Sequence, residues 1–226
     1  MPRRILHVPA RRVVNIVVKV LCLLALLCPL TAADLKSWIG TVERRYNSAR
    51  TMEAAFEQTY LAQGRKRVER GQLSLRKSGR MRWEYTEPAG KLFIADGKWV
   101  WMYSPATGKA ERAKLKASDD ERAPLAFLLG KLDFSRLFRD FELAGSGETT
   151  VIRALPKSDK VPYTSVEFSV GPQGEIRRLK VTNGDGSITE YSFTSERLNG
   201  AVADAKFRFT PPPGVAVEEI TEGGER

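Results

Sequence analysis

Apolar side chains occupy alternate positions in residues 71–105, and short turn motifs separate the alternating runs. The alternating residues are Leu73, Leu75, Met81, Trp83 and Tyr85. A period of two is the pattern of a β-strand that keeps one face out of water. This stretch therefore predicts strands with an apolar, aromatic-rich face and no evident catalytic group.

Three turn motifs divide the same stretch. Ser78-Gly79 can reverse the chain after the first strand, and the Glu-Pro-Ala-Gly sequence at 87–90 interrupts the alternation. Asp96-Gly97 is a strong signal for a two-residue hairpin. Strands joined by such short turns pair antiparallel, so we predict a curved antiparallel meander.

The chain before this stretch predicts one helix and one strand. Asp34 is a suitable helix N-cap, and a helical face of apolar residues follows it. The residues of that face are Leu35, Trp38, Ile39, Val42 and Tyr46. Residues 51–61 then alternate, with Phe56 on the apolar side. Residues 63–70 are predicted to form an exposed turn, because they are rich in charge and contain a glycine.

The chain after it predicts two more helices and further strands. Ala123-Pro124 can open a helix with Leu125, Leu128 and Leu129 on one edge, and residues 133–140 predict a third, short helix. Alternation returns in segments separated by glycine-containing turns. These segments are residues 151–152, 166–170, 176–181, 188–193 and 207–209. The predicted fold class is α+β, mainly β: one strongly curved antiparallel sheet of about ten or eleven strands, covered by about three helices.

Residues 1–33 have the organisation of a secretory signal peptide. Five basic residues precede an uncharged apolar run at 20–30, and small residues at 31–33 offer a cleavage site. The run is shorter than the roughly 20 apolar residues of a membrane-spanning helix, so a permanent anchor is the less favoured alternative. Cys22 and Cys28 each follow a leucine, which argues against lipid attachment. We expect cleavage near Asp34 and a single domain over residues 34–226.

Cleavage would remove every cysteine and the one histidine, His7. That loss excludes thiol nucleophiles, disulfides, Cys/His metal sites and imidazole bases. No Ser-x-x-Lys motif opens a predicted helix, and the acids at 119–121 are best explained as the solvated start of a helix. We therefore predict no catalytic residue, no metal and no cofactor, and we regard a secreted hydrolase as improbable.

Cleavage would also lower the net charge from +10 to +5, because residues 1–33 contain five Lys or Arg and no Asp or Glu. Basic and acidic residues are interleaved along the remainder. Such a surface suits membrane head groups or an acidic protein partner better than nucleic acid.

The inner face of a curved sheet is either filled by the helices or left partly empty. From the residues alone, a packed core is the simpler interpretation, and a cavity is the alternative. The side chains in question are Trp83, Trp101, Ile39, Leu128 and Leu129.

The order of the motifs resembles the LolA family of periplasmic outer-membrane lipoprotein carriers. Its specific part is a Gly-x-Leu strand at 71–73, a basic pair at 76–77, a Trp-x-Tyr strand at 83–85 and Asp-Gly-Lys-x-x-Trp-x-Tyr-x-Pro at 96–105. Ala-Pro-Leu at 123–125 and Phe-Arg-Phe-Thr-Pro-Pro-Pro-Gly-Val at 207–215 follow in the family's order. The resemblance implies an unclosed antiparallel barrel with a helical lid, whose apolar inside receives the acyl chains of lipoproteins.

The same resemblance implies a site and partners. The side chains expected to line the cavity are Ile39, Val42, Phe56, Leu73, Leu75, Met81, Trp83, Trp101, Leu128 and Leu129. The expected function is a monomeric periplasmic carrier that receives acylated lipoproteins from an ATP-driven inner-membrane transporter and delivers them to an outer-membrane receptor. A related exported lipid-binding or envelope-sensing domain, such as a lipoprotein receptor or a specialised paralogue, is the alternative.

One position departs from the family. Where the family usually has Arg-Pro, with an arginine that holds the lid closed, this chain has Lys77-Ser78. A lysine keeps the charge and loses the fork of donors that an arginine offers. Arg76 could take over lid control only if a bulge turned it inward, because strand alternation places it on the opposite face from Leu75 and Lys77.

Overall fold

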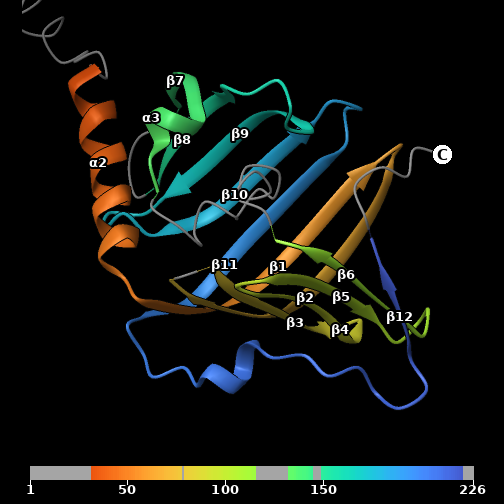
Figure 1. Cartoon of the computed structure of the whole chain (residues 1–226). Helices are drawn as coiled ribbons and strands as arrows, with labels where there is room; N and C mark the ends of the chain where they lie inside the picture. Colours follow the sequence, from red (N-terminus) through yellow and green to blue (C-terminus); the bar gives the residue numbers. More distant parts are fainter. Residues whose placement is uncertain (1–31, 78, 116–131, 145–148, 221–226) are drawn as a thin grey trace, which may run out of the picture. The chain divides into compact units, whose positions relative to one another are not determined.

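The computed structural model describes residues 32–77, 79–115, 132–144 and 149–220. Leu35–Arg226 form one compact unit, and the contacts discussed below lie within it. The described residues of this unit form a single twelve-stranded sheet, which is curved and open (Figure 1). The strands are β1 Thr51–Ala62, β2 Arg65–Arg76, β3 Arg80–Glu87, β4 Ala89–Asp96, β5 Trp99–Ser104, β6 Lys109–Lys114, β7 Phe138–Ala144, β8 Thr150–Pro156, β9 Tyr163–Val170, β10 Ile176–Asn183, β11 Ile188–Leu198 and β12 Ala216–Glu219.

The sheet consists of two meanders. The strand order is β12-β6-β5-β4-β3-β2-β1-β11-β10-β9-β8-β7. Neighbouring strands pair antiparallel except β12, which joins β6 in parallel register. The two meanders meet where β1 pairs with β11, from Met52 opposite Leu198 to Leu61 opposite Ile188. The predicted class, a curved and mainly antiparallel sheet, is confirmed, with twelve strands in place of the ten or eleven expected.

The helices of the described residues are α2 Ala32–Ser48, α3 Phe134–Leu137 and the 3₁₀ helix η3 Asp204–Phe207. Asp34 lies in the first turn of α2, not at its cap, because the helix begins two residues earlier. The helix predicted around Ala123-Pro124 lies outside the described residues.

Three predicted elements differ from the structure: two have wrong boundaries and one is not formed. The helix predicted over 133–140 ends at Leu137, because the chain pairs with β8 from Phe138 onward. The exposed turn predicted over 63–70 is confined to Gln63 and Gly64, both in the left-handed region, and β2 pairs with β1 from Arg65. The strand predicted at 207–209 is absent from the described structure, where η3 ends at Phe207.

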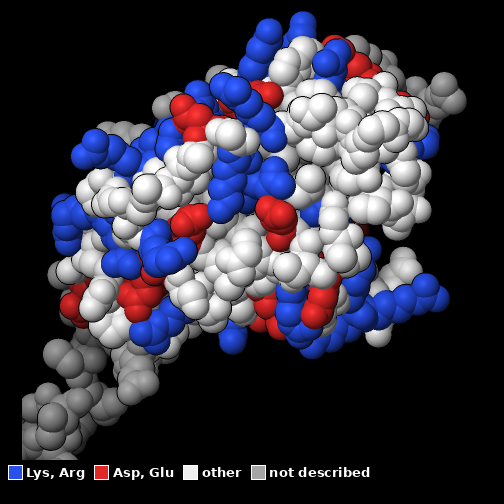
Figure 2. Space-filling model, turned by 90° about the horizontal axis from the view of Figure 1, so that it is seen from below, with Lys and Arg blue, Asp and Glu red and all other residues white. Residues whose placement is uncertain are grey.

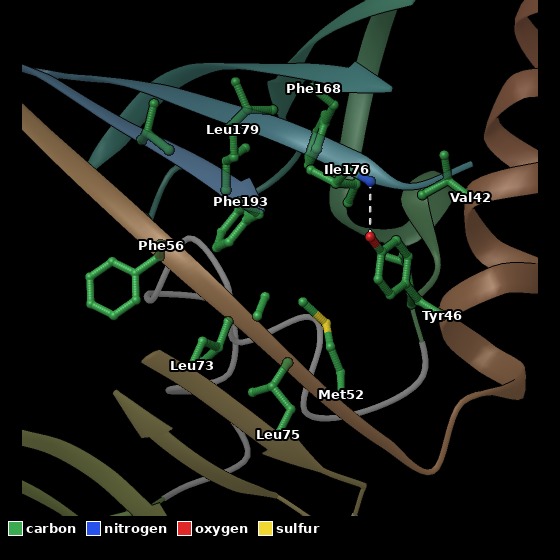
Figure 3. Close-up of a cluster of buried hydrophobic side chains, with 14 of the residues drawn as sticks. Val42, Tyr46, Met52, Phe56, Leu73, Leu75, Phe168, Ile176, Leu179 and Phe193 are labelled. Carbon is green, nitrogen blue, oxygen red and sulfur yellow. Dashed lines mark hydrogen bonds between the residues drawn. The ribbon is translucent and has the colours of Figure 1, made fainter. Parts of the chain in front are cut away.

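The inner face of the sheet is the face that carries Phe56, Leu73 and Leu179, and it holds the hydrophobic core. Val42 and Tyr46 extend from α2 onto this face (Figure 3). The Tyr46 hydroxyl accepts a hydrogen bond from the backbone N–H of Ile176 at 2.9 Å, drawn as a dashed line in Figure 3. It also donates to Glu196 of β11 at 2.7 Å, so one side chain fixes α2 to two strands.

The outer face of β1–β6 is covered by residues 199–215, which we call the C-terminal strap. Phe207 of the strap is 1% exposed, and Phe209 packs edge-on against Trp101 with ring centroids 5.5 Å apart. Lys206 donates to Glu53 of β1 at 2.8 Å, and Asp204 accepts from Arg80 of β3 at 2.9 Å. The view from below shows basic and acidic side chains intermixed (Figure 2).

Candidate ligand cavity

A cavity of about 510 Å³ lies against β3, β4 and β5, with Tyr191 of β11 contributing to its wall. Strand register brings its apolar residues together. Trp83 of β3 lies opposite Phe93 of β4, and Phe93 lies opposite Met102 of β5, so all three belong to the inner face. Met102 is 40% exposed, which leaves the cavity accessible from outside.

Aromatic side chains build the buried wall of the cavity. The ring of Phe56 meets Trp83 at 4.6 Å and Tyr85 at 5.1 Å, both edge-on, and Trp83 meets Tyr191 at 5.5 Å. Gly71 lies between Phe56 and Tyr85 in the sheet. A Cβ atom at Gly71 would lie 2.1 Å from the carbonyl oxygen of Glu84 and 2.9 Å from the Phe56 ring, so this packing requires a glycine.

One end of the cavity is polar. Lys91 donates to the buried carboxylate of Glu69 at 2.6 Å, and its ammonium lies 4.2 Å from the centroid of the Tyr85 ring. Tyr85 donates to the side-chain oxygen of Gln58 at 3.0 Å. Burial raises the pKa of Tyr85, and burial together with the Glu69 charge raises the pKa of Tyr191 to about 12. Both phenols therefore stay protonated at neutral pH and can donate hydrogen bonds.

The structure brings most of the residues predicted to line the site onto one face. Met81 and Trp83 line the cavity itself. Phe56, Leu73 and Leu75 are buried on the same inner face beside it. Val42 of α2 is buried in the same hydrophobic core but does not line the cavity, and Ile39 is half-buried against this core. Leu128 and Leu129 lie outside the described residues. That these side chains bind lipid stays a prediction.

Trp101 was expected in the cavity, and the structure places it on the outer face. Trp101 is opposite Ile94 in the β4–β5 pair, whereas the inner positions of that pair are Phe93 and Met102. Its ring packs against Phe209 of the strap, and its indole N–H donates to Asp96 at 3.3 Å.

The two residues expected to control a lid lie on opposite faces. The Lys77 ammonium donates to the backbone carbonyl of Asn47, in the last turn of α2, at 3.1 Å, and burial lowers its pKa. Arg76 lies on the outer face, where it binds Asp204 and the carbonyl of Val202 in the strap. No bulge turns Arg76 inward, because β1 and β2 pair without a register shift there. Arg76 is therefore a strap contact rather than a substitute for Lys77.

Sequence reasoning missed several cavity residues. Phe93 and Met102 could have been found from alternation, because the register from Trp83 through the Asp96-Gly97 hairpin assigns both to the inner face. The same alternation along β4 assigns Lys91, two residues before Phe93, to the inner face. Tyr191 gave no such signal, because β11 lies far away in the sequence and reaches the cavity only in the folded sheet.

Among the described residues, no group of three or more His, Cys, Asp or Glu side chains could hold a metal ion. Within the same residues, no helix has the length and apolar character needed to cross a membrane.

Comparisons with known proteins agree with these features. Residues 47–210 match a family described as outer membrane lipoprotein carrier protein LolA. The outer-membrane lipoprotein carrier protein of Chromobacterium violaceum is 28% identical over 197 residues, covering 85% of this chain and 93% of that protein. The protein of the same name from Klebsiella pneumoniae is 29% identical over 190 residues, covering 83% and 87%.

A solved structure shares the fold at low sequence identity. An uncharacterised conserved protein from Thermus thermophilus is 12% identical, with a TM-score of 0.51, covering 82% of this chain and 99% of that chain. A LolA superfamily protein from Nitrosomonas europaea is 10% identical, with a TM-score of 0.44, covering 77% and 97%.

Proposed function

Because the chain belongs to the LolA family of outer-membrane lipoprotein carrier proteins, we propose that it binds the acyl chains of lipoproteins in the inner-face cavity and carries them between membranes. The observation that supports this most directly is the accessible apolar cavity formed by Met81, Trp83, Phe93 and Met102. Its volume of about 510 Å³ lies within the range of about 300–1,000 Å³ that is usual for small-molecule sites.

The size of the cavity fits an acyl chain. A methylene group fills about the same volume as a water molecule in the liquid, about 30 Å³. The cavity therefore has room for roughly 17 methylenes, the length of one common acyl chain. Each methylene moved from a bilayer into water costs about 0.8 kcal/mol, so an unassisted chain of that length would cost more than about 10 kcal/mol to extract. A cavity that replaces one apolar surface with another offsets most of this cost.

The proposal is a carrier and not an enzyme. The described residues contain neither cysteine nor histidine, and two of the cavity's polar side chains are paired, Lys91 with Glu69 and Tyr85 with Gln58. A nucleophile with an oriented base, which a hydrolase needs, has no candidate in this arrangement.

The cellular setting is part of the same proposal. We expect residues 1–33 to direct export and to be removed, which places a monomeric carrier in the periplasm. Its partners would be an ATP-driven transporter of the inner membrane and a lipoprotein receptor of the outer membrane.

A pair of matched substitutions tests the proposal. Met102→Glu places a carboxylate at the cavity, whereas Leu61→Glu places one at the tip of the β1–β2 hairpin, away from it; the two side chains are 40% and 39% exposed. Because both sites reach water, both variants should fold, as circular dichroism can check. Displacement of a fluorescent fatty acid by a synthetic lipopeptide then measures binding.

We expect Met102→Glu to weaken binding at least tenfold, since a charge against an acyl chain costs more than about 1.4 kcal/mol. Leu61→Glu should bind as the wild type does. Equal binding by all three proteins would contradict the assignment of this cavity as the acyl site. Mass spectrometry of lipids and lipoproteins that co-purify with the exported protein would distinguish a lipoprotein carrier from a general lipid-binding domain.

A further inference from the structure

The phenol of Tyr191 packs against two aromatic rings and leaves its hydroxyl available to a ligand. Its ring lies parallel to that of Phe193, with centroids 6.3 Å apart, and tilted against Trp83 at 5.5 Å. The side chain lines the cavity, and its hydroxyl makes no hydrogen bond to any other described residue. A donor without a partner among the described residues, beside an apolar surface, suits a ligand that carries an acceptor next to its acyl chain.

A second donor lies at the same end of the cavity. The Lys91 ammonium has three N–H bonds. One is directed at Glu69, and the ammonium also lies over the ring of Tyr85. The Lys91 side chain is 30% exposed and lines the cavity, so a ligand acceptor can reach it.

The ammonium of Lys91 is already paired within the protein. Glu69 is 5% exposed and lies 2.6 Å from Lys91, and the largely exposed Arg67 approaches the same carboxylate at 3.5 Å. An anionic phosphate placed against Lys91 would therefore be repelled by the buried carboxylate of Glu69. A neutral carbonyl oxygen accepts a hydrogen bond from Tyr191 or Lys91 without that repulsion.

From this geometry we infer that Tyr191 and Lys91 form a subsite for the ester or amide carbonyl groups that join acyl chains to the polar part of the ligand. This rests on the proposed function, because it assumes that the chains lie against Trp83, Phe93 and Met102. The subsite gives the ligand a direction: the chains extend toward Trp83, and the polar part leaves past Lys91 and Glu69.

A comparison of ester-linked and ether-linked ligands tests the subsite, since they differ in the carbonyl oxygens. The probes are dioctanoylglycerol and the corresponding dioctyl diether, each used to displace a fluorescent fatty acid from the full chain. We expect wild-type protein to prefer the ester about two- to tenfold, the contribution of one net hydrogen bond. Tyr191→Phe should lose this preference by binding the ester more weakly and the ether unchanged.

Tyr60→Phe is the matched control. Tyr60 follows Gln58 on the inner face of β1, outside the cavity lining, and it contacts Arg67 through its ring, which a phenylalanine retains. This variant should keep the wild-type ester preference. Thermal unfolding of both variants checks that the fold is intact.

The source of the carbonyl is identified by two further probes. A short peptide with an S-dioctanoylglyceryl cysteine should bind at least as well as dioctanoylglycerol and should show the same sensitivity to Tyr191→Phe. Dioctanoyl phosphatidic acid adds a phosphate, and if it bound more tightly than dioctanoylglycerol, the carbonyl assignment would be overturned in favour of an anionic head group.

The outcomes separate the two proposals. Wild-type protein that binds ester and ether equally, or a Tyr191→Phe variant that keeps the preference, would refute the subsite and leave the carrier function standing. Wild-type protein that binds none of the acyl probes would instead refute the proposed function.

Discussion

The two ends of the inner face have the same alternation of inward and outward side chains, but they differ in how deeply the inward side chains are buried. On β8, β9 and β10 the inward side chains are completely buried, as Ile152, Phe168 and Leu179 illustrate. On β4 and β5 the inward Phe93 is half-buried and Met102 is 40% exposed beside a cavity. We call these the packed half and the cavity half.

What differs between the halves is the set of elements that cover them. Phe134 of α3 meets Phe168 at 5.0 Å, Phe138 meets it at 5.6 Å, and Val42 and Tyr46 of α2 belong to the same buried cluster (Figure 3). Phe93 and Met102 lack comparable aromatic cover among the described residues, whereas Ala95, also inward on β4, is buried in the core. A strand thus determines which side chains point inward, and the covering elements determine whether those side chains become core or binding surface.

The largest predicted effect separates stability from binding. Phe168→Ala removes a fully buried ring from the packed half, so the free energy of unfolding should fall by about 3–5 kcal/mol. Affinity of the folded protein for an acyl probe should not change. Urea denaturation and probe titration measure the two quantities, and a large affinity loss with little loss of stability would erase the distinction between the halves.

The next effect applies to the buried wall that joins the halves. Gly71→Ala drives a methyl group against the Glu84 carbonyl and the Phe56 ring, and overpacking of this kind costs about 1–3 kcal/mol. Because Phe56 supports Trp83 and Tyr85, we expect weaker probe binding as well as lower stability. Gly200→Ala is the matched control, because a Cβ atom there has no other atom within 4 Å and the backbone φ is not positive.

A smaller effect is expected at Lys77, which connects β2 of the cavity half to the end of α2. A cation at a helix C-terminus contributes about 0.5–1 kcal/mol, so Lys77→Leu should lower the free energy of unfolding by that amount. If the position also controls access to the cavity, as the family resemblance implies, Lys77→Leu should raise the affinity for an apolar probe and Lys77→Arg should lower it. Unchanged affinity in both variants would limit Lys77 to anchoring α2.

The smallest predicted effect is on the outer face, where a substitution should alter neither the packing of the packed half nor the probe affinity of the cavity half. The hydrogen bond from Lys206 holds the pKa of Glu53 below its ordinary value of 4.5. Below pH 4.5 the unfolded chain therefore binds more protons than the folded protein, so the stabilisation is present above that pH and is lost as the pH falls through the folded-state pKa. Glu53→Gln should remove this acid dependence, worth about 0.2–1 kcal/mol for a partly exposed pair, without altering probe affinity. Thermal unfolding from pH 3 to 7 measures it, and an unchanged pH profile would show that the strap does not depend on this pair.

Much of the sheet could be predicted because strand alternation is local information. The inward side chains of β1, β2 and β3 follow from it, as do the turns at Gly79 and Gly97. The same reasoning fails for residues 134–141. The apolar residues there, Phe134, Leu137, Phe138 and Phe141, have helical spacing. The helix nevertheless ends before Phe138, because the chain pairs with β8 from that residue onward. Non-local pairing overrode the local pattern there.

The candidate site was predictable only in part. Met81 and Trp83 lie where alternation places them, and Trp101 could have been excluded by extending the register one strand further. At the polar end, Glu69 and Lys91 follow from extending the alternation along β2 and β4, the two neighbours of β3. Tyr191 could not have been foreseen, because it comes from β11 and meets Trp83 only in the folded sheet.

The short strand β12 bears on how the protein behaves at high concentration. An open sheet presents the backbone groups of its edge strands to other molecules, and long apolar edges invite aggregation. β12 covers β6 with only four residues, all exposed, and two of them are carboxylates that pair with Lys109 and Arg112. The edge that remains is short and charged, so it is a poor template for pairing with a strand of a second copy.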